Sequence, residues 1–372
     1  MSKKDKIKVG ILFGGKSAEH QVSLQSAKNV IDAMDKQQYQ PVLIGIDLSG
    51  RWRLYNADNF LSNSDNPETI QLNNPGDFVS LVPQSNGRLI SETNAMNPIL
   101  LDVIFPMLHG PFGEDGTIQG LLKIVNVPFV GSSVLGSSIG MDKEIMKRIL
   151  RDANIPIGKF ITIHSTDEKP TFDSIVSKLG PNFFVKPANM GSSVGVRKVH
   201  NDFEYQQAME DAFKFDKKIL VEETIVGREL ECAILGNNQP QASVIGEVIT
   251  SHDFYSYQAK YIDSNGSETQ IPATISEQQS QQIQQLAIKT FKVLNTEGFG
   301  RVDVFLTSTG KVFVNEINTI PGFTKISMYP KLWEASGIQY ANLINQLIQL
   351  ALDRFHKEQC LMTDVRVNEL NF

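Results

Sequence analysis

The chain has 372 residues, 41% of them hydrophobic and 20% charged, and its 35 basic and 41 acidic side chains give a net charge of −6. A single hydrophobic core stops growing beyond about 250–300 residues, so the length predicts two or three domains. The acidic balance argues against a nucleic-acid-binding protein, which usually has a basic domain. The two cysteines, Cys232 and Cys360, are too few for a disulfide framework or a zinc cluster. Neither a membrane helix of roughly 20 apolar residues nor the apolar segment of a signal peptide is evident. We therefore expect a cytoplasmic protein without nucleic-acid or membrane partners.

The N-terminal third alternates between strand and helix patterns. Residues 7–13 form a short apolar run that ends in two glycines, and an amphipathic helix follows over residues 24–34, with Ser17 or Ser23 as the expected N-cap. Strands are predicted at 41–46 and 100–105. This alternation predicts an α/β domain with a parallel sheet. The polar residues 56–98 are expected to form an insertion or an extended loop.

The remaining two thirds contain further predicted helices and strands. Helices are expected near 142–153, 283–294 and 339–355, and strands at 183–186, 194–199, 218–222 and 229–235, followed by a hairpin of 301–306 and 311–318. The helix near residue 142 is expected to open a second domain.

Residues 10–17 match the phosphate-loop pattern G-x-x-x-x-G-K-S/T. A phosphate loop needs its first glycine after a strand, whereas Gly10 lies inside the apolar run. We therefore favour a strand-to-helix turn whose amide groups suit an anion near Glu19 and Ser23. The alternative is a nucleotide-dependent switch that uses Lys16.

A glycine- and serine-rich loop follows the predicted strand 183–186. Backbone amides and hydroxyl groups of such a loop can approach phosphate oxygens, while Lys186 in the preceding strand supplies a positive charge. The loop contains Gly191, Ser192, Ser193 and Gly195. A flexible surface hairpin is the alternative.

The hairpin 301–318 carries the strongest candidate metal ligands. Glu316 and Asn318 are two residues apart and share one face of a strand. A four-residue turn pairs Leu306 with Lys311, which would place Arg301 opposite Glu316 and Asp303 diagonally from it. Two carboxylates and an amide oxygen suit Mg²⁺. The alternative is an exposed, charged hairpin face.

Two weaker signals lie elsewhere. A predicted strand ends at Glu222, and Glu223 and Glu229 follow it; acidic groups at such a strand end can bind ribose hydroxyls. His109 follows the end of another strand, where a histidine is more often a hydrogen-bond partner than a catalyst.

Seven segments together resemble the D-alanine–D-alanine ligase family of the ATP-grasp superfamily. They are GGKSAEHQVSL (14–24), HGPFGEDG (109–116), MDK (141–143), VKPANMGSSVG (185–195), AKY (259–261), GRVD (300–303) and NEINTIPG (315–322). They occur in the family's order over nearly the whole chain.

The resemblance implies a three-domain α/β ATP-grasp fold. The implied domains are an N-terminal α/β domain (1–136) for the first substrate, a central domain (137–222) with the phosphate loop, and a C-terminal domain (223–372) for metal and second substrate. ATP would lie between the central and C-terminal sheets. It would phosphorylate the carboxylate of one D-alanine, and the amine of a second would attack the acyl phosphate. A homodimer and Mg²⁺ or Mn²⁺, as two ions, are also implied.

The resemblance implies the following site residues. Glu19, Ser192, Tyr261, Arg301 and Ser327 would be catalytic, with Glu19 pairing with the first ammonium, Ser192 and Tyr261 holding a closing loop, and Arg301 stabilising transferred charge together with the Gly322 amide. His109, Gly322 and Met328 would bind substrate. ATP would contact Lys143, Lys186, Ser193, Glu222, Glu223, Ile225, Glu229, Phe254, Lys260 and Asn315. Asp303, Glu316 and Asn318 would hold the metal.

Two details concern specificity. Glu223 stands where some members have lysine, so its contact with adenine would be through the backbone. Related ligases that make D-alanyl-D-lactate lack the tyrosine found here at position 261, which favours a peptide product. A depsipeptide or mixed-substrate ligase and a non-catalytic sensor on a ligase scaffold are the alternatives.

Overall fold

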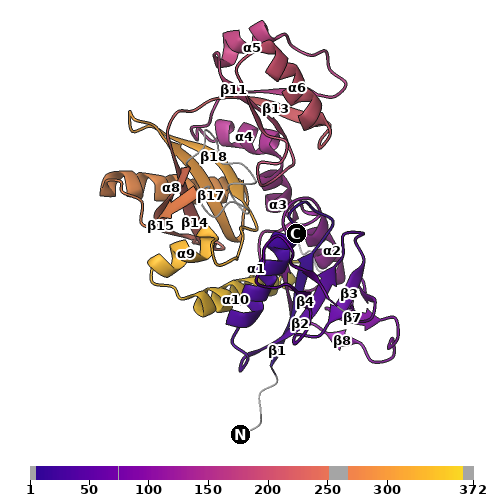
Figure 1. Ribbon diagram of the computed structural model, residues 1–372. Helices are drawn as coiled ribbons and strands as arrows, with labels where there is room; N and C mark the ends of the chain where they lie inside the picture. The colour runs from indigo at the N-terminus through magenta and orange to yellow at the C-terminus, as the bar shows by residue number, and fades with distance from the viewer. Residues whose placement is uncertain (1–5, 74, 251–266, 363–372) are drawn as a thin grey trace, which may run out of the picture.

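Three β-sheets organise the chain in the computed structural model, which describes residues 6–73, 75–250 and 267–362 (Figure 1). The first sheet has the order β3-β2-β1-β9 and contains β1 (Ile7–Gly14), β2 (Tyr39–Ile46), β3 (Trp52–Tyr55) and β9 (Val103–Met107). β1 pairs in parallel with both β2 and β9, and only β3 is antiparallel. Helices α1 (His20–Ala33) and α2 (Thr117–Val125) follow β1 and β9. The predicted parallel sheet is confirmed.

Gly10 lies in the middle of β1, paired with Val42 of β2 and Ile104 of β9. A residue held in two ladders cannot begin a phosphate loop, so the strand interpretation of residues 7–13 is confirmed. The predicted cap of the next helix is wrong, because the N-cap of α1 is Glu19 and its side chain makes no capping bond. Ser23 lies inside α1, where its hydroxyl instead accepts from Gly14 N at 2.7 Å and donates to the Met107 carbonyl.

Residues 56–98 contain short strands, so of the two alternatives, an insertion or an extended loop, the extended loop is wrong. The strands are β4 (Leu61–Ser62), β5 (Gln71–Leu72), β6 (Val79–Leu81) and β7 (Arg88–Ser91), and β8 (Ile99–Leu100) follows them. They form two small antiparallel sheets, β4-β5 and β6-β7-β8. Phe60 and Ile70, next to β4 and β5, are buried in one N-terminal core, and Val79 of β6 and Leu89 of β7 are buried in another, which fixes both sheets on the domain.

The second sheet has the order β10-β13-β11-β12 and is antiparallel throughout. It contains β10 (Phe160–His164), β11 (Phe183–Pro187), β12 (Arg197–Val199) and β13 (Lys218–Glu223), with helices α5 (Phe172–Leu179) and α6 (Asp202–Phe213). These elements share a core of their own, built around Phe183 and Tyr205. The predicted strand 194–199 is shorter than expected, because residues 190–196 form a loop.

The third sheet has the order β16-β15-β14-β17-β18. It contains β14 (Arg228–Gly236), β15 (Gln241–Thr250), β16 (Ser267–Gln270), β17 (Gly298–Leu306) and β18 (Val312–Asn318), with helices α8 (Glu277–Val293), α9 (Met328–Ala335) and α10 (Tyr340–Gln359). Two further helices, α3 (Val134–Met141) and α4 (Lys143–Asp152), connect the first sheet to the second. Met146 and Leu150 of α4 pack into the core of the third sheet.

The predicted register of the β17–β18 hairpin is wrong. Leu306 pairs with Val312, because Thr307 closes the turn through bonds of its amide and hydroxyl to Lys311. A bulge between Asp303 and Val304 shifts the register once more. Asp303 therefore lies directly opposite Glu316 rather than diagonally from it, and Arg301 lies opposite Asn318.

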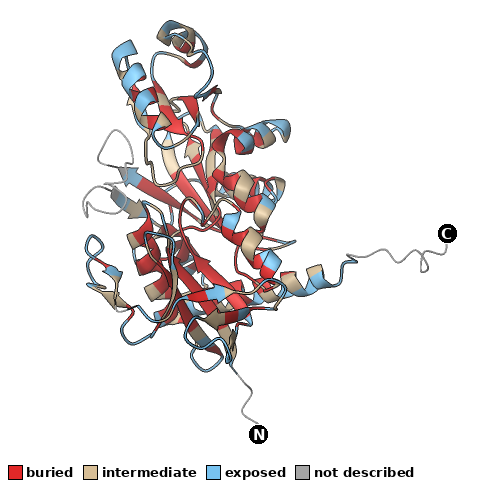
Figure 2. Ribbon diagram, turned by 90° about the vertical axis from the view of Figure 1, so that its right-hand side faces the viewer, coloured by how far each residue is buried: buried red, intermediate tan, exposed pale blue. Residues whose placement is uncertain are grey.

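One hydrophobic core joins the first and third sheets. Phe323, which follows the third sheet, packs edge-on against Phe105 of β9 at 6.2 Å and against Phe299 of β17 at 5.9 Å between ring centroids. Figure 2 shows these buried strands running through the centre of the molecule, with exposed surface on the outer helices. Within the described ranges, no helix has the length and apolar character needed to cross a membrane.

Candidate active site

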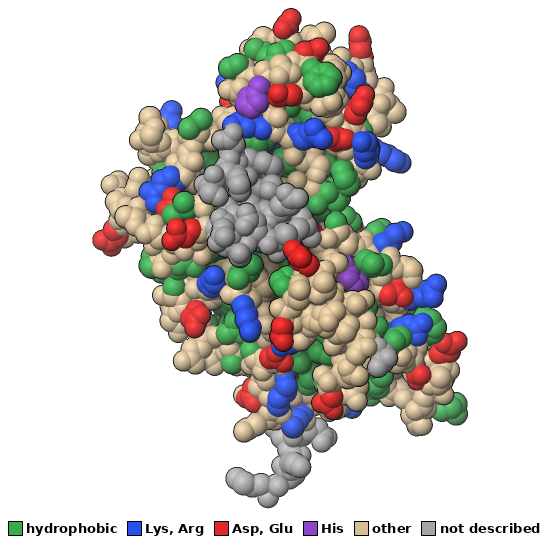
Figure 3. Space-filling model, in the orientation of Figure 1, with side chains coloured by type: hydrophobic (Ala, Val, Ile, Leu, Met, Phe, Trp, Pro, Cys, Tyr) green, Lys and Arg blue, Asp and Glu red, His purple; other side chains and the backbone are tan. Residues whose placement is uncertain are grey.

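A pocket with a volume of about 460 Å³ is lined by residues of both the second and the third sheet. Of the predicted site residues, its lining includes Lys143, Lys186, Ser192, Ser193, Glu222, Glu223, Ile225, Glu229, Asn315 and Glu316. The bulge in the β17–β18 ladder leaves Asn315 unpaired, so Asn315 and Glu316 both line the pocket although they are consecutive in a strand. Figure 3 shows Lys and Arg side chains along the underside of the upper lobe that carries β11 and β13.

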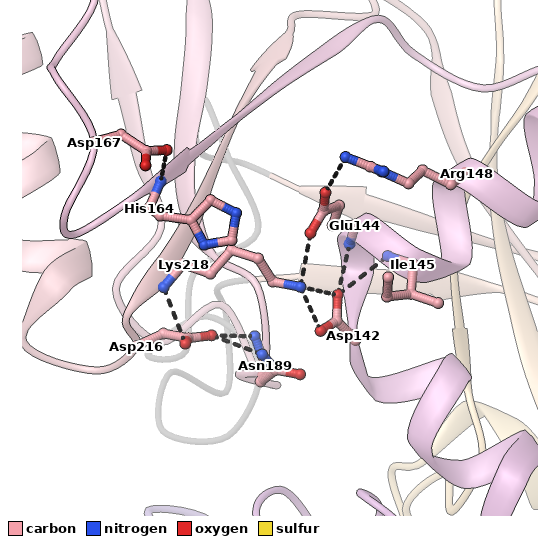
Figure 4. Close-up of polar contacts among 9 residues, drawn as sticks. All are labelled: Asp142, Glu144, Ile145, Arg148, His164, Asp167, Asn189, Asp216 and Lys218. Atoms are coloured by element: carbon pink, nitrogen blue, oxygen red, sulfur yellow. Dashed lines mark hydrogen bonds and ion pairs between the residues drawn. The ribbon is translucent and has the colours of Figure 1, made fainter.

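Lys143 is the first residue of α4, and its position is fixed by a polar network around the start of that helix. Asp142 caps α4 by accepting from the amides of Glu144 and Ile145 at 3.1 Å. Lys218 of β13 bridges Asp142 at 2.6 Å and Glu144 at 2.8 Å, so it ties the helix start to the second sheet (Figure 4).

The Lys143 ammonium lies between the phosphate-type loop and the third sheet. It donates to the Met190 carbonyl at 2.7 Å and lies 3.4 Å from the Glu316 carboxylate. A cation in this position can neutralise an anionic ligand that binds between the loop and the third sheet.

Lys186 of β11 contacts Glu222, the penultimate residue of β13. The other Glu222 oxygen lies 2.5 Å from Nζ of Lys147, whose side chain is completely buried. Burial raises the pKa of Glu222, but the two ammonium groups outweigh burial and the pKa is lowered. Glu222 is therefore a buried carboxylate held ionised by two lysines.

The loop after β11 adopts an unusual backbone conformation. Ser192 and Ser193 have φ angles of 50° and 58°, in the left-handed region that non-glycine residues rarely adopt. Such strain at a ligand-facing loop is typical of functional sites. The Ser192 hydroxyl donates to the carboxylate of Glu19, which joins this loop to the N-terminal domain.

Glu19 is 7% exposed and sits among closely approaching glycines. A side chain at Gly110, whose φ is +74°, would place its Cβ 2.7 Å from Glu19 Oε2, and one at Gly191 would lie 3.0 Å from the same atom. Gly110 of the N-terminal domain and Gly191 of the loop after β11 therefore leave space for the Glu19 carboxylate between them.

Arg301, Asp303 and Asn318 form a contiguous polar cluster on the third sheet. Nε and Nη2 of Arg301 donate to the two Asp303 oxygens at 2.7 Å, and Nδ2 of Asn318 donates to Asp303 at 2.9 Å. Arg301 also lies 3.0 Å from Glu231 of β14. The guanidinium is thus fixed by two buried carboxylates.

Asp303, Glu316 and Asn318 meet the chemical requirement for a Mg²⁺ or Mn²⁺ site. They lie at neighbouring positions of paired strands and supply hard oxygen donors. No cluster of three or more His, Cys, Asp or Glu side chains suited to a metal occurs in the described part of the chain. The candidate donor set therefore consists of two carboxylates and one amide, which leaves coordination positions for phosphate oxygens and water.

His109 and Glu114 lie in the loop between β9 and α2. Burial lowers the pKa of His109 to about 4, and its ring contacts Ser26 Oγ at 3.2 Å and the Ile320 carbonyl at 3.0 Å. Glu114 accepts from the amides of Gly110 at 2.8 Å and Ile320 at 3.0 Å. Both side chains therefore hold the segment after β18 against the N-terminal domain.

Of the remaining predicted residues, three lie in the part of the chain that the structure describes and three lie outside it. Gly322 and Ser327 lie together, since a Cβ at Gly322 would be 2.7 Å from the Ser327 hydroxyl, which bonds Thr324. Met328 is buried in the core shared by the first and third sheets. Phe254, Lys260 and Tyr261 lie outside the described residues.

Several polar residues of this region were not predicted from sequence. Lys147 carried a usable signal, because it is four residues after Lys143 and four-residue spacing places both on one side of a helix. Glu231 lies two residues after Glu229 in β14, so the two side chains share one face of the strand, and Glu231 pairs with Arg301. Glu114 stood within a quoted motif, but only the fold reveals its contact with Ile320.

Family models match both parts of the chain. Residues 8–132 match the model described as "D-ala D-ala ligase N-terminus", and residues 149–349 match "D-ala D-ala ligase C-terminus". The chain belongs to the D-alanine–D-alanine ligase family. The resemblance inferred from the sequence motifs is thereby confirmed.

Curated relatives of this ligase family match along nearly the full length. D-alanine–D-alanine ligase from Oceanobacillus iheyensis is 53% identical over 96% of this chain and 98% of its own. D-alanine–D-alanine ligase A from Salmonella typhimurium is 51% identical over 96% and 99%.

Solved structures of two ligases share the fold. The D-alanine–D-alanine ligase from Coxiella burnetii superposes with a TM-score of 0.80 at 37% identity, covering 95% of this chain and 97% of that one. The VanG D-Ala:D-Ser ligase from Enterococcus faecalis gives a TM-score of 0.81 at 32% identity, covering 93% and 100%. The three-sheet α/β architecture is therefore that of the ligase family.

Proposed function

We propose that the protein is an ATP-dependent ligase that joins two D-alanines into D-alanyl-D-alanine, with release of ADP and phosphate, for peptidoglycan precursor synthesis. The identity of about 50% over nearly the full length of named D-alanine–D-alanine ligases supports this function. The observation that carries it is the contact between Ser192 and Glu19. It joins the loop of a lysine-lined pocket to a buried carboxylate suited to an ammonium group.

The reaction proceeds in two steps. A carboxylate oxygen of the first D-alanine attacks the γ-phosphorus of ATP, and the bond to ADP breaks. The deprotonated amine of the second D-alanine then attacks the acyl carbon, and phosphate leaves. Lys143 and Lys186 offset phosphate charge, Glu19 pairs with the first ammonium, and Arg301 stabilises the oxyanion formed in the second step.

Mg²⁺ or Mn²⁺, held by Asp303, Glu316 and Asn318, would neutralise charge on the phosphates. The polar cluster on β17 and β18 supports this assignment because its donors are hard oxygens. We assign adenosine binding to Glu222, Glu223, Ile225 and Glu229. Ser193 and Asn315 are assigned to ATP binding as well, since all six residues line the pocket. We further propose that Phe254, Lys260, Tyr261, His109, Gly322, Ser327 and Met328 complete the substrate sites.

The three-domain division at residues 136/137 and 222/223, a homodimer and a cytoplasmic location are also part of this proposal. Free Cys232 and Cys360 are compatible with a reducing compartment. Light scattering of the purified protein would test the dimer, with twice the chain mass of 41.4 kDa as the expected result.

A coupled assay of ADP formation tests the function. We expect turnover with ATP, Mg²⁺ and D-alanine, no turnover with L-alanine, and loss of turnover in EDTA. ATP turnover that does not depend on any amino acid would contradict the ligase function.

The second substrate needs its own comparison, because the fold is shared with a D-Ala:D-Ser ligase. The products formed from D-alanine in competition with D-serine or D-lactate should be separated by mass spectrometry. We expect D-alanyl-D-alanine to predominate. A predominant D-serine or D-lactate product would reassign the second-substrate specificity while retaining the ligase class.

A further inference from the structure

Lys147 is a buried cation next to the nucleotide pocket that the proposed mechanism does not use. It lies one turn after Lys143 in α4, and its side chain is 0% exposed. It is absent from the pocket lining, whereas its partner Glu222 and the next lysine, Lys186, both line the pocket. Lys147 therefore does not line the ligand site itself, and its ion-pair partner is Glu222.

The three side chains form a chain of alternating charge. Nζ of Lys147 lies 2.5 Å from Glu222 Oε1, and Nζ of Lys186 contacts Glu222 Oε2. Each oxygen of the single carboxylate thus binds one ammonium group. Two cations and one anion leave one positive charge, and only the Lys186 end of the chain borders the pocket.

Structural stability alone does not account for a lysine at this position. Removing an ammonium group from water is costly, and burial lowers the pKa of Lys147 even though Glu222 opposes that shift. Replacing buried ion pairs by apolar side chains of similar volume is often neutral or stabilising. A lysine therefore has to be explained by what its charge does to Glu222 and Lys186.

We propose that Lys147 is a positioning residue that sets the charge presented by Lys186 to the nucleotide phosphates. By occupying one oxygen of Glu222, Lys147 prevents that carboxylate from fully neutralising Lys186. Without Lys147, Glu222 and Lys186 form a closed neutral pair, and the ammonium turns away from the phosphates. This inference rests on the proposed function, because it takes a nucleotide as the ligand of the pocket.

Nucleotide binding to Lys147→Met tests the proposal by isothermal titration with ADP plus Mg²⁺ and, separately, with adenosine. We expect the affinity for ADP to fall by about tenfold or more, since an electrostatic contact with the phosphates is lost. The affinity for adenosine and the KM for D-alanine should change less than about twofold, while the KM for ATP rises. An equal loss for ADP and adenosine, or no loss for ADP, would overturn the proposal.

Arg354→Met is the matched control, because Arg354 is another buried cation and lies in α10 away from the pocket. It should lower the unfolding temperature without changing the ratio of ADP to adenosine affinity. If Lys147→Met shows no cooperative unfolding, Lys147→Gln replaces it under the same criteria.

A double-mutant cycle identifies the route of the effect. In a Glu222→Gln background, Lys147→Met should change the ADP-to-adenosine ratio less than about twofold, because Lys147 no longer has a carboxylate to share. The same loss in both backgrounds would overturn the route through Glu222. Failure of the proposed function is distinguishable, since the unsubstituted protein would then make no D-alanyl-D-alanine.

Discussion

Glu114 and His109 show how burial at one loop moves two ionisable groups in opposite senses. Burial, followed by the charge of Glu19, raises the pKa of Glu114 to about 8, while burial lowers the pKa of His109 to about 4. Both groups are neutral in the folded protein near pH 7, because the low-dielectric surroundings disfavour either charge. We therefore expect the contacts between the N-terminal domain and the segment after β18 to depend on pH.

Glu114 should make the protein less stable as pH rises. Between its unfolded pKa of 4.5 and its folded pKa of about 8, the folded state holds a proton that the unfolded state has released. The free energy of unfolding therefore decreases with pH over this interval, by at most about 1.4 kcal/mol per pH unit.

Urea unfolding of Glu114→Gln at pH 5.5 and 7.5 measures this effect. The loss of stability between these pH values should be smaller in Glu114→Gln than in the unsubstituted protein by about 1–3 kcal/mol. The exposed Glu334→Gln should retain the original slope. The contribution of His109 is common to all three proteins, so equal slopes in all three would contradict the assignment to Glu114.

At the scale of elements, the active-site geometry depends on loops and one bulge rather than on regular strands. The bulge of the β17–β18 hairpin turns Asn315 and Glu316 into the same pocket, and the loop after β9 places Gly110 against Glu19. These irregular segments bring side chains from different sheets together, which alternating strands alone cannot do.

Gly110→Ala should impair binding of D-alanine more than it impairs folding. A Cβ at Gly110 would lie 2.7 Å from Glu19 Oε2, so the carboxylate must move. We expect the KM for D-alanine to rise about tenfold, alongside a stability loss of about 1–2 kcal/mol from the left-handed backbone.

Gly337→Ala provides a matched control for that substitution. Gly337 has φ +91°, and a Cβ at this position would have no other atom within 4 Å, so it shares the backbone strain but not the clash. It should lose similar stability and keep the KM for D-alanine. An unchanged KM in Gly110→Ala, measured from initial rates, would contradict the role of this close approach.

For the whole molecule, the N-terminal and C-terminal parts form one packed body, whereas the second sheet has a separate core. Arg354 of α10 connects the C-terminal part to the N-terminal part. Its guanidinium donates to the Gly131 carbonyl and, at 2.8 Å, to the Phe129 carbonyl, and it stacks 4.6 Å from the Phe129 ring centroid.

Arg354→Met should destabilise the packing of α10 on the N-terminal part without changing the active site. Two buried carbonyls lose a charged donor, so we expect the free energy of unfolding to fall by about 2–4 kcal/mol. Ligase activity at about 20 °C, well below the new transition, should remain within about twofold. Unchanged urea unfolding would show that α10 is held by its apolar face alone.

The division between residues 136 and 137 stays a prediction. Helix α4 belongs to the predicted central domain by sequence, yet Met146 and Leu150 pack in the core of the third sheet. Hydrogen exchange with and without ADP would show whether α4 is protected together with the second sheet or with the third.

Apolar periodicity and motif order are local properties of the chain, and from them the sequence predicts the parallel N-terminal sheet, part of the helices and strands, and the ligase family. Long elements such as β15 and α6 were not predicted. The sequence also predicted candidate site residues, among them Lys143, Lys186 and Glu316, that line one pocket in the structure. The pairing of Asp303 with Glu316 depends on the three-dimensional fold, since a side-chain bond at Thr307 and a bulge set the register. The same holds for the sharing of Glu222 between Lys147 and Lys186, because buried charges are paired by distances across elements that local sequence does not specify.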